Sequence, residues 1–262
     1  MNGIFSRAMN LRYTETGYIF MAPGDDCARI VDAMLYTDYH EEFCVALSFD
    51  PGFLVDLMAA GFLVMSTRID RPPDSPPDYP RYLLLPKLHL ERSALFFPDI
   101  RETKTARRLL NRYELRFDAD FDTIMERCVE THGDAWLTPP LRESIRRIRA
   151  MDKQLRTRNG ESAVEIRPVS FGLYREGKLV AGEFGVLAGG VYTSYSGYRD
   201  EDSSGTVQLI LTGRWLRDRG AAFWDLGMPL AYKDRLGAVN VSPARFVDLF
   251  RGALSMGLCP DE

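Results

Sequence analysis

The last third of the chain alternates between apolar runs and tight turns, and no other feature limits its possible folds as strongly. Residues 170–174, 179–187 and 191–195 are rich in β-branched and aromatic side chains, which favour strands. The sequences REGK and AGG separate these runs and supply residues typical of turns. The pattern therefore predicts three antiparallel strands that are neighbours in one sheet.

Helical periodicity surrounds this predicted sheet. One apolar stripe consists of Phe121, Ile124, Met125 and Cys128, and a second of Leu141, Ile145, Ile148 and Leu155. Further helices are predicted at 51–60, 102–111, 206–219 and 243–253, and short strands at 82–86 and 223–226. The order strand–strand–strand–helix–strand after a helical block predicts an α+β chain. It is also the order of the acyltransferase fold of GCN5-related N-acetyltransferases.

Proline is concentrated in one segment, residues 68–82, which holds five of the fifteen prolines. Because proline fixes φ and keeps its predecessor out of the helical region, we expect an extended linker there. The predicted organisation is a small N-terminal α/β domain at 1–67, this linker at 68–82, and an acyltransferase-like domain at 83–262.

The net charge of −4 is unevenly distributed. Residues 101–116 carry six basic and two acidic side chains, and residues 141–158 carry seven and two. At helical spacing these form two basic ridges, the second of which follows Arg142, Arg146, Arg149, Lys153 and Arg156. Such ridges suit a polyanion, although solvated helix faces have the same pattern.

Other function classes find little support in the composition. No run of about 18 apolar residues occurs, so no membrane span is predicted. The four cysteines and three histidines lack the spacing of a metal site or a disulfide framework, so no metal is predicted. Isolated cysteines of this kind fit a reducing, cytoplasmic compartment.

The most specific pattern lies between Arg219 and Val247. A predicted strand ends in Trp224-Asp225-Leu226-Gly227, and Arg235-Leu236-Gly237-Ala238 follows. Upstream, Ala135-Trp136-Leu137-Thr138 and Leu179-Val180-Ala181-Gly182 precede it in order. In this ordered series, from Phe97 to Phe250, the chain resembles a divergent member of the leucyl/phenylalanyl-tRNA–protein transferase family.

The resemblance implies an enzyme that moves Leu, Phe or Met from aminoacyl-tRNA to the amino terminus of an acceptor protein, which marks that protein for N-degron proteolysis. Because an aminoacyl ester is already activated, such an enzyme mainly positions an amine against a carbonyl. Asp225 stands at the family's functional aspartate and is the expected catalytic residue, to orient the amine or accept its proton directly or through a neighbour. Its alternative role is to cap the following turn. The resemblance implies no cofactor, and we expect a monomer.

The resemblance also implies two sets of binding residues. The substrate-binding set is Leu83, Leu84, Trp136, Tyr195, Ser196, Tyr198 and Gly227. The tRNA-binding set is Lys104, Arg107, Arg108, Arg112, Arg146 and Lys153. Tyr195 stands where the family has Glu, Gly227 where it has Gln, and Leu83-Leu84 where it has two tryptophans. The acidic residues Asp200, Glu201 and Asp202 are candidates to replace the lost negative charge, or they complement the dipole of the following helix.

Three alternative functions stay open at this level. An acyl-CoA-dependent N-acetyltransferase would share the fold, but the three acidic residues before helix 206–219 would repel a pyrophosphate. A catalytically impaired relative would bind tRNA or protein amino termini without transfer, as Tyr195 and Gly227 suggest. A peptidoglycan-bridge aminoacyltransferase usually carries two copies of the fold, and this chain has the length for one.

Overall fold

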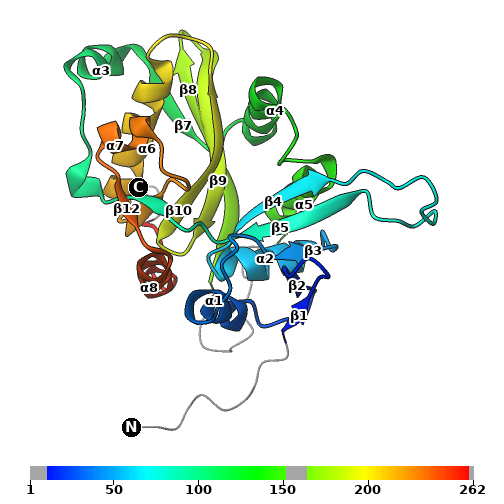
Figure 1. Ribbon diagram of the computed structural model, residues 1–262. Helices are drawn as coiled ribbons and strands as arrows, with labels where there is room; N and C mark the ends of the chain where they lie inside the picture. The colour runs from blue at the N-terminus through cyan, green and yellow to red at the C-terminus, as the bar shows by residue number, and fades with distance from the viewer. Residues whose placement is uncertain (1–10, 152–163, 260–262) are drawn as a thin grey trace, which may run out of the picture.

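The computed structural model describes residues 11–151 and 164–259 and arranges them around two β-sheets (Figure 1). The first sheet has the order β1-β2-β3-β5-β4, and the second has the order β12-β6-β11-β10-β9-β8-β7. The strands of the first sheet are β1 (Arg12–Tyr13), β2 (Ile19–Met21), β3 (Val45–Ala46), β4 (Leu63–Arg68) and β5 (Tyr82–Lys87). Those of the second are β6 (Arg92–Leu95), β7 (Glu114–Phe117), β8 (Ile166–Arg175), β9 (Lys178–Ala188), β10 (Val191–Arg199), β11 (Phe223–Asp225) and β12 (Val239–Val241).

Helices cover both faces of the second sheet. Their bounds are α1 (Cys27–Tyr36), α2 (Pro51–Ala59), η1 (Phe97–Asp99), α3 (Lys104–Leu109), η2 (Leu110–Arg112), α4 (Phe121–His132), α5 (Pro139–Ala150), α6 (Ser204–Asp218), α7 (Ala231–Leu236) and α8 (Pro243–Ala253). We call the face that packs against the first sheet, α2, α4 and α5 the front face. The opposite face, which packs against α3 and α6, is the back face. Figure 1 shows these two groups on either side of the long strands β8 and β9.

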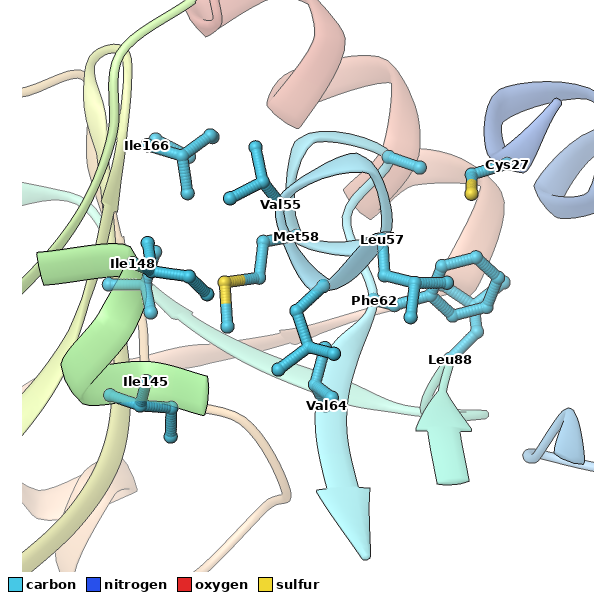
Figure 2. Close-up of a cluster of buried hydrophobic side chains, with 14 of the residues drawn as sticks. Cys27, Val55, Leu57, Met58, Phe62, Val64, Leu88, Ile145, Ile148 and Ile166 are labelled. Carbon is cyan, nitrogen blue, oxygen red and sulfur yellow. The ribbon is translucent and has the colours of Figure 1, made fainter. Parts of the chain in front are cut away.

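Helix α2 joins the first sheet to the front face. It begins well because Asp50 accepts a hydrogen bond from the Phe53 N–H and Pro51 occupies the first turn. Figure 2 shows Val55 and Met58 directed from α2 toward Ile148 of α5 and Ile166 of β8. Leu57, on another side of the helix, lies with Phe62 and Leu88. One apolar cluster therefore runs through both sheets, and its burial stabilises their association.

The proline-rich segment 68–82 does not link two domains. Strands β4 and β5 pair antiparallel from Leu63 with Lys87 to Arg68 with Tyr82, so the segment closes a hairpin within the first sheet. The predicted boundary between residues 67 and 83 therefore cuts through this sheet. Proline content correctly indicated a segment outside helix and strand, but it does not reveal which strands pair across it.

The predicted three-stranded meander is confirmed, because β8, β9 and β10 pair antiparallel in sequence. Helix α6 follows, and β11 then pairs parallel to β10. The chain is thus α+β, with the strand and helix order expected of a GCN5-related N-acetyltransferase-like fold. Strands β6 and β7 were not predicted, because their short runs carry no clear period.

Strands β10 and β11 stay paired over only three residues. The last pair joins Thr193 to Asp225, after which β10 continues to Arg199 beside β9 alone. A register shift between Ser194 and Ser196 marks the same point of β10. The chain turns away from β10 at Gly227, whose φ of +71° suits glycine. The two strands therefore part directly after Thr193 and Asp225, both of which are buried.

Candidate active site

Asp225, the expected catalytic residue, lies at the end of β11 and is completely buried on the front face. Arg92 of β6 binds both of its oxygens, with Nε donating to Oδ1 at 2.9 Å and Nη2 donating to Oδ2 at 2.6 Å. The Thr193 hydroxyl donates to Oδ2 at 2.9 Å, and the Gly227 N–H donates to Oδ1 at 3.0 Å. The carboxylate thus has four donors, which is near its full hydrogen-bonding capacity.

This environment fixes the charge of Asp225. Burial by itself would raise its pKa, but the charge and hydrogen bonds of Arg92 hold the pKa below its ordinary value. A carboxylate that is ionised and fully bound is a poor proton acceptor. The role of Asp225 in orienting the amine or accepting its proton stays a prediction, and in the structure Arg92 of a distant strand binds both of its carboxylate oxygens. The expected turn cap is present, in the bond from Gly227.

Arg92 links Asp225 to the first sheet. Its Nη1 donates to the Gly61 carbonyl at 3.0 Å, in the turn between α2 and β4. Its guanidinium carbon lies 3.9 Å from the centre of the Phe246 ring in α8. Sequence reasoning missed Arg92, since an arginine in a short apolar run resembles an ordinary edge residue. The pair therefore joins β11, β6, α8 and the first sheet at one buried point.

Gly227 faces a buried histidine. A Cβ added to Gly227 would lie 3.8 Å from His89 Nε2 and 3.9 Å from Leu63 Cδ1. His89 is 4% exposed, and its Nε2 has no hydrogen-bond partner in the described chain. Burial, with the charges of Arg92 and Lys87, lowers the pKa of His89 to about 3. The imidazole is therefore neutral at pH 7 and lies next to Gly227.

Tyr195 and Trp136, both predicted to bind substrate, lie close together. Both are partly buried, and their ring centres lie 6.4 Å apart on the front face. The Tyr195 hydroxyl accepts a hydrogen bond from the Val64 N–H at 3.4 Å, which ties β10 to β4. Tyr195 also lines a small cavity with Arg92 and Thr193. The phenol at this position thus has a defined partner in the first sheet.

The other expected substrate-binding residues are dispersed. Leu84 is fully buried in the core and pairs with Ser66 of β4, whereas Leu83 is partly buried on the opposite side of β5. Tyr198 lies beside α4, where the Arg127 guanidinium carbon is 4.9 Å from the centre of its ring. Ser196 lies near Cys128 of the same helix. The structure therefore does not gather all of these residues around one cavity.

The acidic residues before α6 are bound by arginines. Asp200 pairs with Arg127 at 2.6 Å, and Glu201 pairs with Arg175 at 2.7 Å. In the sequence analysis these residues were candidates to replace the negative charge of the Glu found in the family at position 195. Because Asp200 and Glu201 are ion-paired, less of that charge is free. Since acidic groups still surround the start of α6, a pyrophosphate would not be favoured there.

The two basic ridges lie on opposite faces. Lys104, Arg107 and Arg108 of α3 and Arg112 of η2 are exposed on the back-face side. Arg146 lies on α5, where it donates to Asp122 at 2.7 Å and also binds Glu126 of α4. The contact of Arg146 with tRNA stays a prediction, and in the structure carboxylates of α4 already bind its guanidinium group. Lys153 lies outside the described residues.

A second buried carboxylate, Glu183 of β9, lies on the back face and is 4% exposed. Its Oε2 accepts a hydrogen bond from the Ser194 hydroxyl at 3.1 Å, whereas its Oε1 has no hydrogen-bond partner in the described residues. Burial raises the pKa of Glu183 to about 7. Sequence reasoning passed over this residue, although it is the one charged side chain between Leu179 and Ala188.

The structure also bears on the other expected partners. Among the described residues no helix combines the length and the apolar character needed to cross a lipid bilayer. The predicted cytoplasmic location and the predicted monomeric state stay predictions.

Comparison with known proteins identifies the family. A relative from Pseudomonas entomophila, named leucyl/phenylalanyl-tRNA–protein transferase, is 30% identical over 173 residues, which cover 64% of this chain and 66% of the relative. A relative of the same name from Rubrobacter xylanophilus is 26% identical over 167 residues, covering 63% of this chain and 80% of that protein. The chain thus spans slightly less than two thirds of the length of the Pseudomonas relative.

Solved structures show more distant similarity. FemX is 12% identical with a TM-score of 0.46, over 90% of this chain and 80% of that chain. A GCN5-related N-acetyltransferase from Kribbella flavida is 14% identical with a TM-score of 0.32, over 75% of this chain and 63% of that chain. The family model described as leucyl/phenylalanyl-tRNA protein transferase matches residues 94–251, more than half of the chain. The chain therefore belongs to the leucyl/phenylalanyl-tRNA protein transferase family.

Proposed function

We propose that this protein transfers an amino acid from aminoacyl-tRNA to the amino terminus of an acceptor protein. The observation that carries the proposal is the family match over residues 94–251, a range that includes the parting of β10 and β11. The names of the relatives favour leucine and phenylalanine as the donated residues, and methionine is a further candidate. The product would be a protein with a new amino terminus that marks it for N-degron proteolysis.

The chemistry of this proposal requires little beyond positioning. The ester carbonyl must meet a neutral amine, and a nearby group must accept the proton that the amine loses. Partly buried side chains around the parted strands, such as Tyr195 and Trp136, offer apolar surface for the donated side chain.

Asp225 enters the proposal as a positioning residue. Through Arg92 and Thr193 it holds the ends of β11 and β6 against β10. Loss of Asp225 would remove the bonds that hold the end of β11 to β6 and β10. This role agrees with the direct bonds of the carboxylate and requires no contact between Asp225 and substrate.

The exposed cations of α3 and η2 support contact with the tRNA. Within the described residues no ion pair holds Lys104, Arg108 or Arg112, and all three are exposed. A phosphate backbone would meet these side chains without displacing an internal partner. We therefore assign tRNA contact to α3 and η2 and leave α5 out of it.

A donor and acceptor scan tests the function. The purified protein is supplied in turn with Leu-tRNA, Phe-tRNA and Met-tRNA, and with peptides that begin with each of the twenty residues. We expect at least one donor to be joined to peptides beginning with Arg or Lys, and the mass of the product to rise by one residue. Peptides of the same sequence with an acetylated amino terminus are the matched control.

Two outcomes would contradict the proposal. Transfer to no peptide, together with retained tRNA binding, would identify a relative that binds without chemistry. Binding of acetyl-CoA by calorimetry, without binding of charged tRNA, would identify an acyl-CoA-dependent enzyme.

A further inference from the structure

Glu183 occupies an unusual place for a carboxylate. It lies near the middle of β9, a strand buried along nearly its whole length, with Phe171 of β8 and Gly197 of β10 as its register partners. A buried charge is normally paired, as Asp225 is. No salt bridge holds Glu183 in the described part of the chain, and its Oε1 is without a hydrogen bond. The fold therefore retains a buried carboxylate with only part of its hydrogen-bonding capacity used.

Ser194 connects this carboxylate with the parting of the strands. It is the first residue of β10 beyond the last pair with β11, and it is partly exposed. Its hydroxyl accepts a hydrogen bond from the Trp224 indole N–H at 2.8 Å and lies 3.1 Å from Glu183 Oε2. Because an indole N–H only donates, the Ser194 proton is free to point to Glu183. Glu183 is buried and Ser194 is only partly buried, so Ser194 is the more accessible end of this chain of bonds.

The polar groups around Glu183 come from several elements. Lys233 of α7 is 5% exposed, and its ammonium group donates to the Leu226 carbonyl and, at 2.7 Å, to the Met228 carbonyl. The Gln208 side chain of α6 is close enough to lower the pKa of Glu183. The other titratable groups whose charges interact with Glu183 are Tyr192 of β10, Tyr232 of α7 and Cys128 of α4. Lys233 is the one cation among them, and it holds the loop after β11.

The protonation of Glu183 suits proton transfer. Burial raises its pKa to about 7, so the carboxylate gains and loses a proton near neutral pH. Burial also lowers the pKa of Lys233 to about 8. A buried carboxylate in this state destabilises the fold relative to a neutral amide of the same shape, and such groups are concentrated at functional sites.

We propose that Glu183 accepts, through the Ser194 hydroxyl, the proton that the acceptor amine loses when it attacks the aminoacyl ester. This inference rests on the proposed function and deepens it. A bond forms between the amine nitrogen and the carbonyl carbon, and the bond from that carbon to the tRNA 3′ oxygen breaks. The amine proton passes to the Ser194 oxygen while the Ser194 proton passes to Glu183. The released 3′ oxygen then takes a proton back along the same route.

The test compares Glu183→Gln and Ser194→Ala with the unmodified protein in the transfer assay. Loss of a positioned base lowers rates by about 10²–10⁴-fold, and we expect both variants to fall in this range. Below pH 7 the logarithm of the rate should rise with pH with a slope of about 2 in the unmodified protein, since the acceptor amine and Glu183 must both lose a proton. In Glu183→Gln the slope should fall to about 1.

Three controls separate this role from a structural one. Thr212→Val alters a buried hydroxyl that bonds Gln208 but not Glu183, and it should change stability without changing the slope. Combining Glu183→Gln with Ser194→Ala should lower the rate no further than either change alone. Infrared difference spectra should show one carboxyl that titrates near pH 7 and is missing from Glu183→Gln.

The outcomes are distinguishable. If the unmodified protein transfers but Glu183→Gln keeps its rate and slope, this inference is overturned and the proposed function stands. A carboxylate at position 183 that titrates near its ordinary value would also overturn it. If the unmodified protein transfers nothing to any acceptor, both proposals fail together.

Discussion

Two buried carboxylates on opposite faces of one sheet differ in the hydrogen-bond and ion-pair partners that the fold gives them. On the front face Asp225 accepts four hydrogen bonds and is ion-paired with Arg92. On the back face Glu183 has no ion-pair partner in the described chain and leaves one oxygen without a hydrogen bond. The adjacent residues Thr193 and Ser194 bind one carboxylate each, because successive side chains of a strand point to opposite faces.

The basic residues repeat this difference. Arg146, on the front-face side, is bound to carboxylates of α4, whereas Lys104 and Arg108, on the back-face side, lack an ion pair in the described chain. The front face thus uses its charges to hold the structure together. On the back-face side Arg214 of α6 also pairs with Glu102, but Glu183, Lys104 and Arg108 have no ion-pair partner among the described residues. The degree of burial does not by itself distinguish a paired charge from an unpaired one. The free energy of a buried charge depends on the ion-pair and hydrogen-bond partners around it.

The largest effect is expected from removing the Arg92 partner. Arg92→Met leaves Asp225 as an uncompensated buried charge, which should lower the free energy of unfolding by about 3–5 kcal/mol, measured by denaturant titration. Arg127→Met is the matched control, since the Arg127–Asp200 pair has the same 2.6 Å distance but is 39% and 36% exposed. It should cost about 1 kcal/mol or less. Equal costs would show that the front-face pair gains nothing from burial.

The two carboxylates should respond to pH in opposite directions. With its pKa raised from 4.5 to about 7, Glu183 binds more protons in the folded than in the unfolded state between these values, so its contribution to stability falls as pH rises through them. Glu183→Gln should therefore be more stable than the unmodified protein at pH 8, by up to about 3 kcal/mol, and equal to it near pH 4.5.

Asp225 provides the contrast for this measurement. Since its folded pKa lies below the ordinary 3.8, it adds stability above that pH and loses it as pH falls through the folded value. Asp225→Asn should therefore be less stable than the unmodified protein at pH 7, with a difference that narrows in acid. Denaturant titrations at several pH values measure both variants, and parallel pH dependence would remove the distinction between the faces.

A smaller effect is expected for tRNA binding. Changing Lys104 and Arg108 together to Glu should weaken tRNA binding by roughly tenfold and reduce its salt dependence by about one phosphate contact for each residue. Arg146→Ala, on the other face, should leave the affinity unchanged. Filter binding across a salt series measures both. A stronger loss from Arg146→Ala would place the RNA on the front face instead.

The smallest effect concerns the contact between the sheets. Tyr195→Phe removes the acceptor of the Val64 N–H and should lower the free energy of unfolding by about 0.5–1.5 kcal/mol, measured by thermal denaturation. Tyr13→Phe, in which an exposed hydroxyl is removed, should have no measurable effect and serves as the control. A full loss of transfer by Tyr195→Phe without destabilisation would assign the phenol to substrate.

Local patterns were sufficient to predict several elements of the fold. Apolar runs and turn residues predicted β8, β9 and β10. The helix predicted at 243–253 coincides with the observed α8. The pairing of β4 with β5 across residues 68–82 was not predicted, because it depends on strands that meet only after the chain reverses. The same limit applied to the site. Asp225 was identified by resemblance, but its partner Arg92 lies 133 residues away in sequence.

The sequence alone determined the family, the α+β class and the presence of a lone glutamate within an apolar strand, because each depends on residues close together or in a fixed order. Tertiary structure decided which buried charge met a partner. A buried carboxylate has the same chemistry on either face of the sheet. Its pKa and its contribution to the stability of the fold depend on the hydrogen-bond donors that other strands place beside it. Those donors come from distant parts of the chain, so only the packed sheets distinguish Asp225 from Glu183.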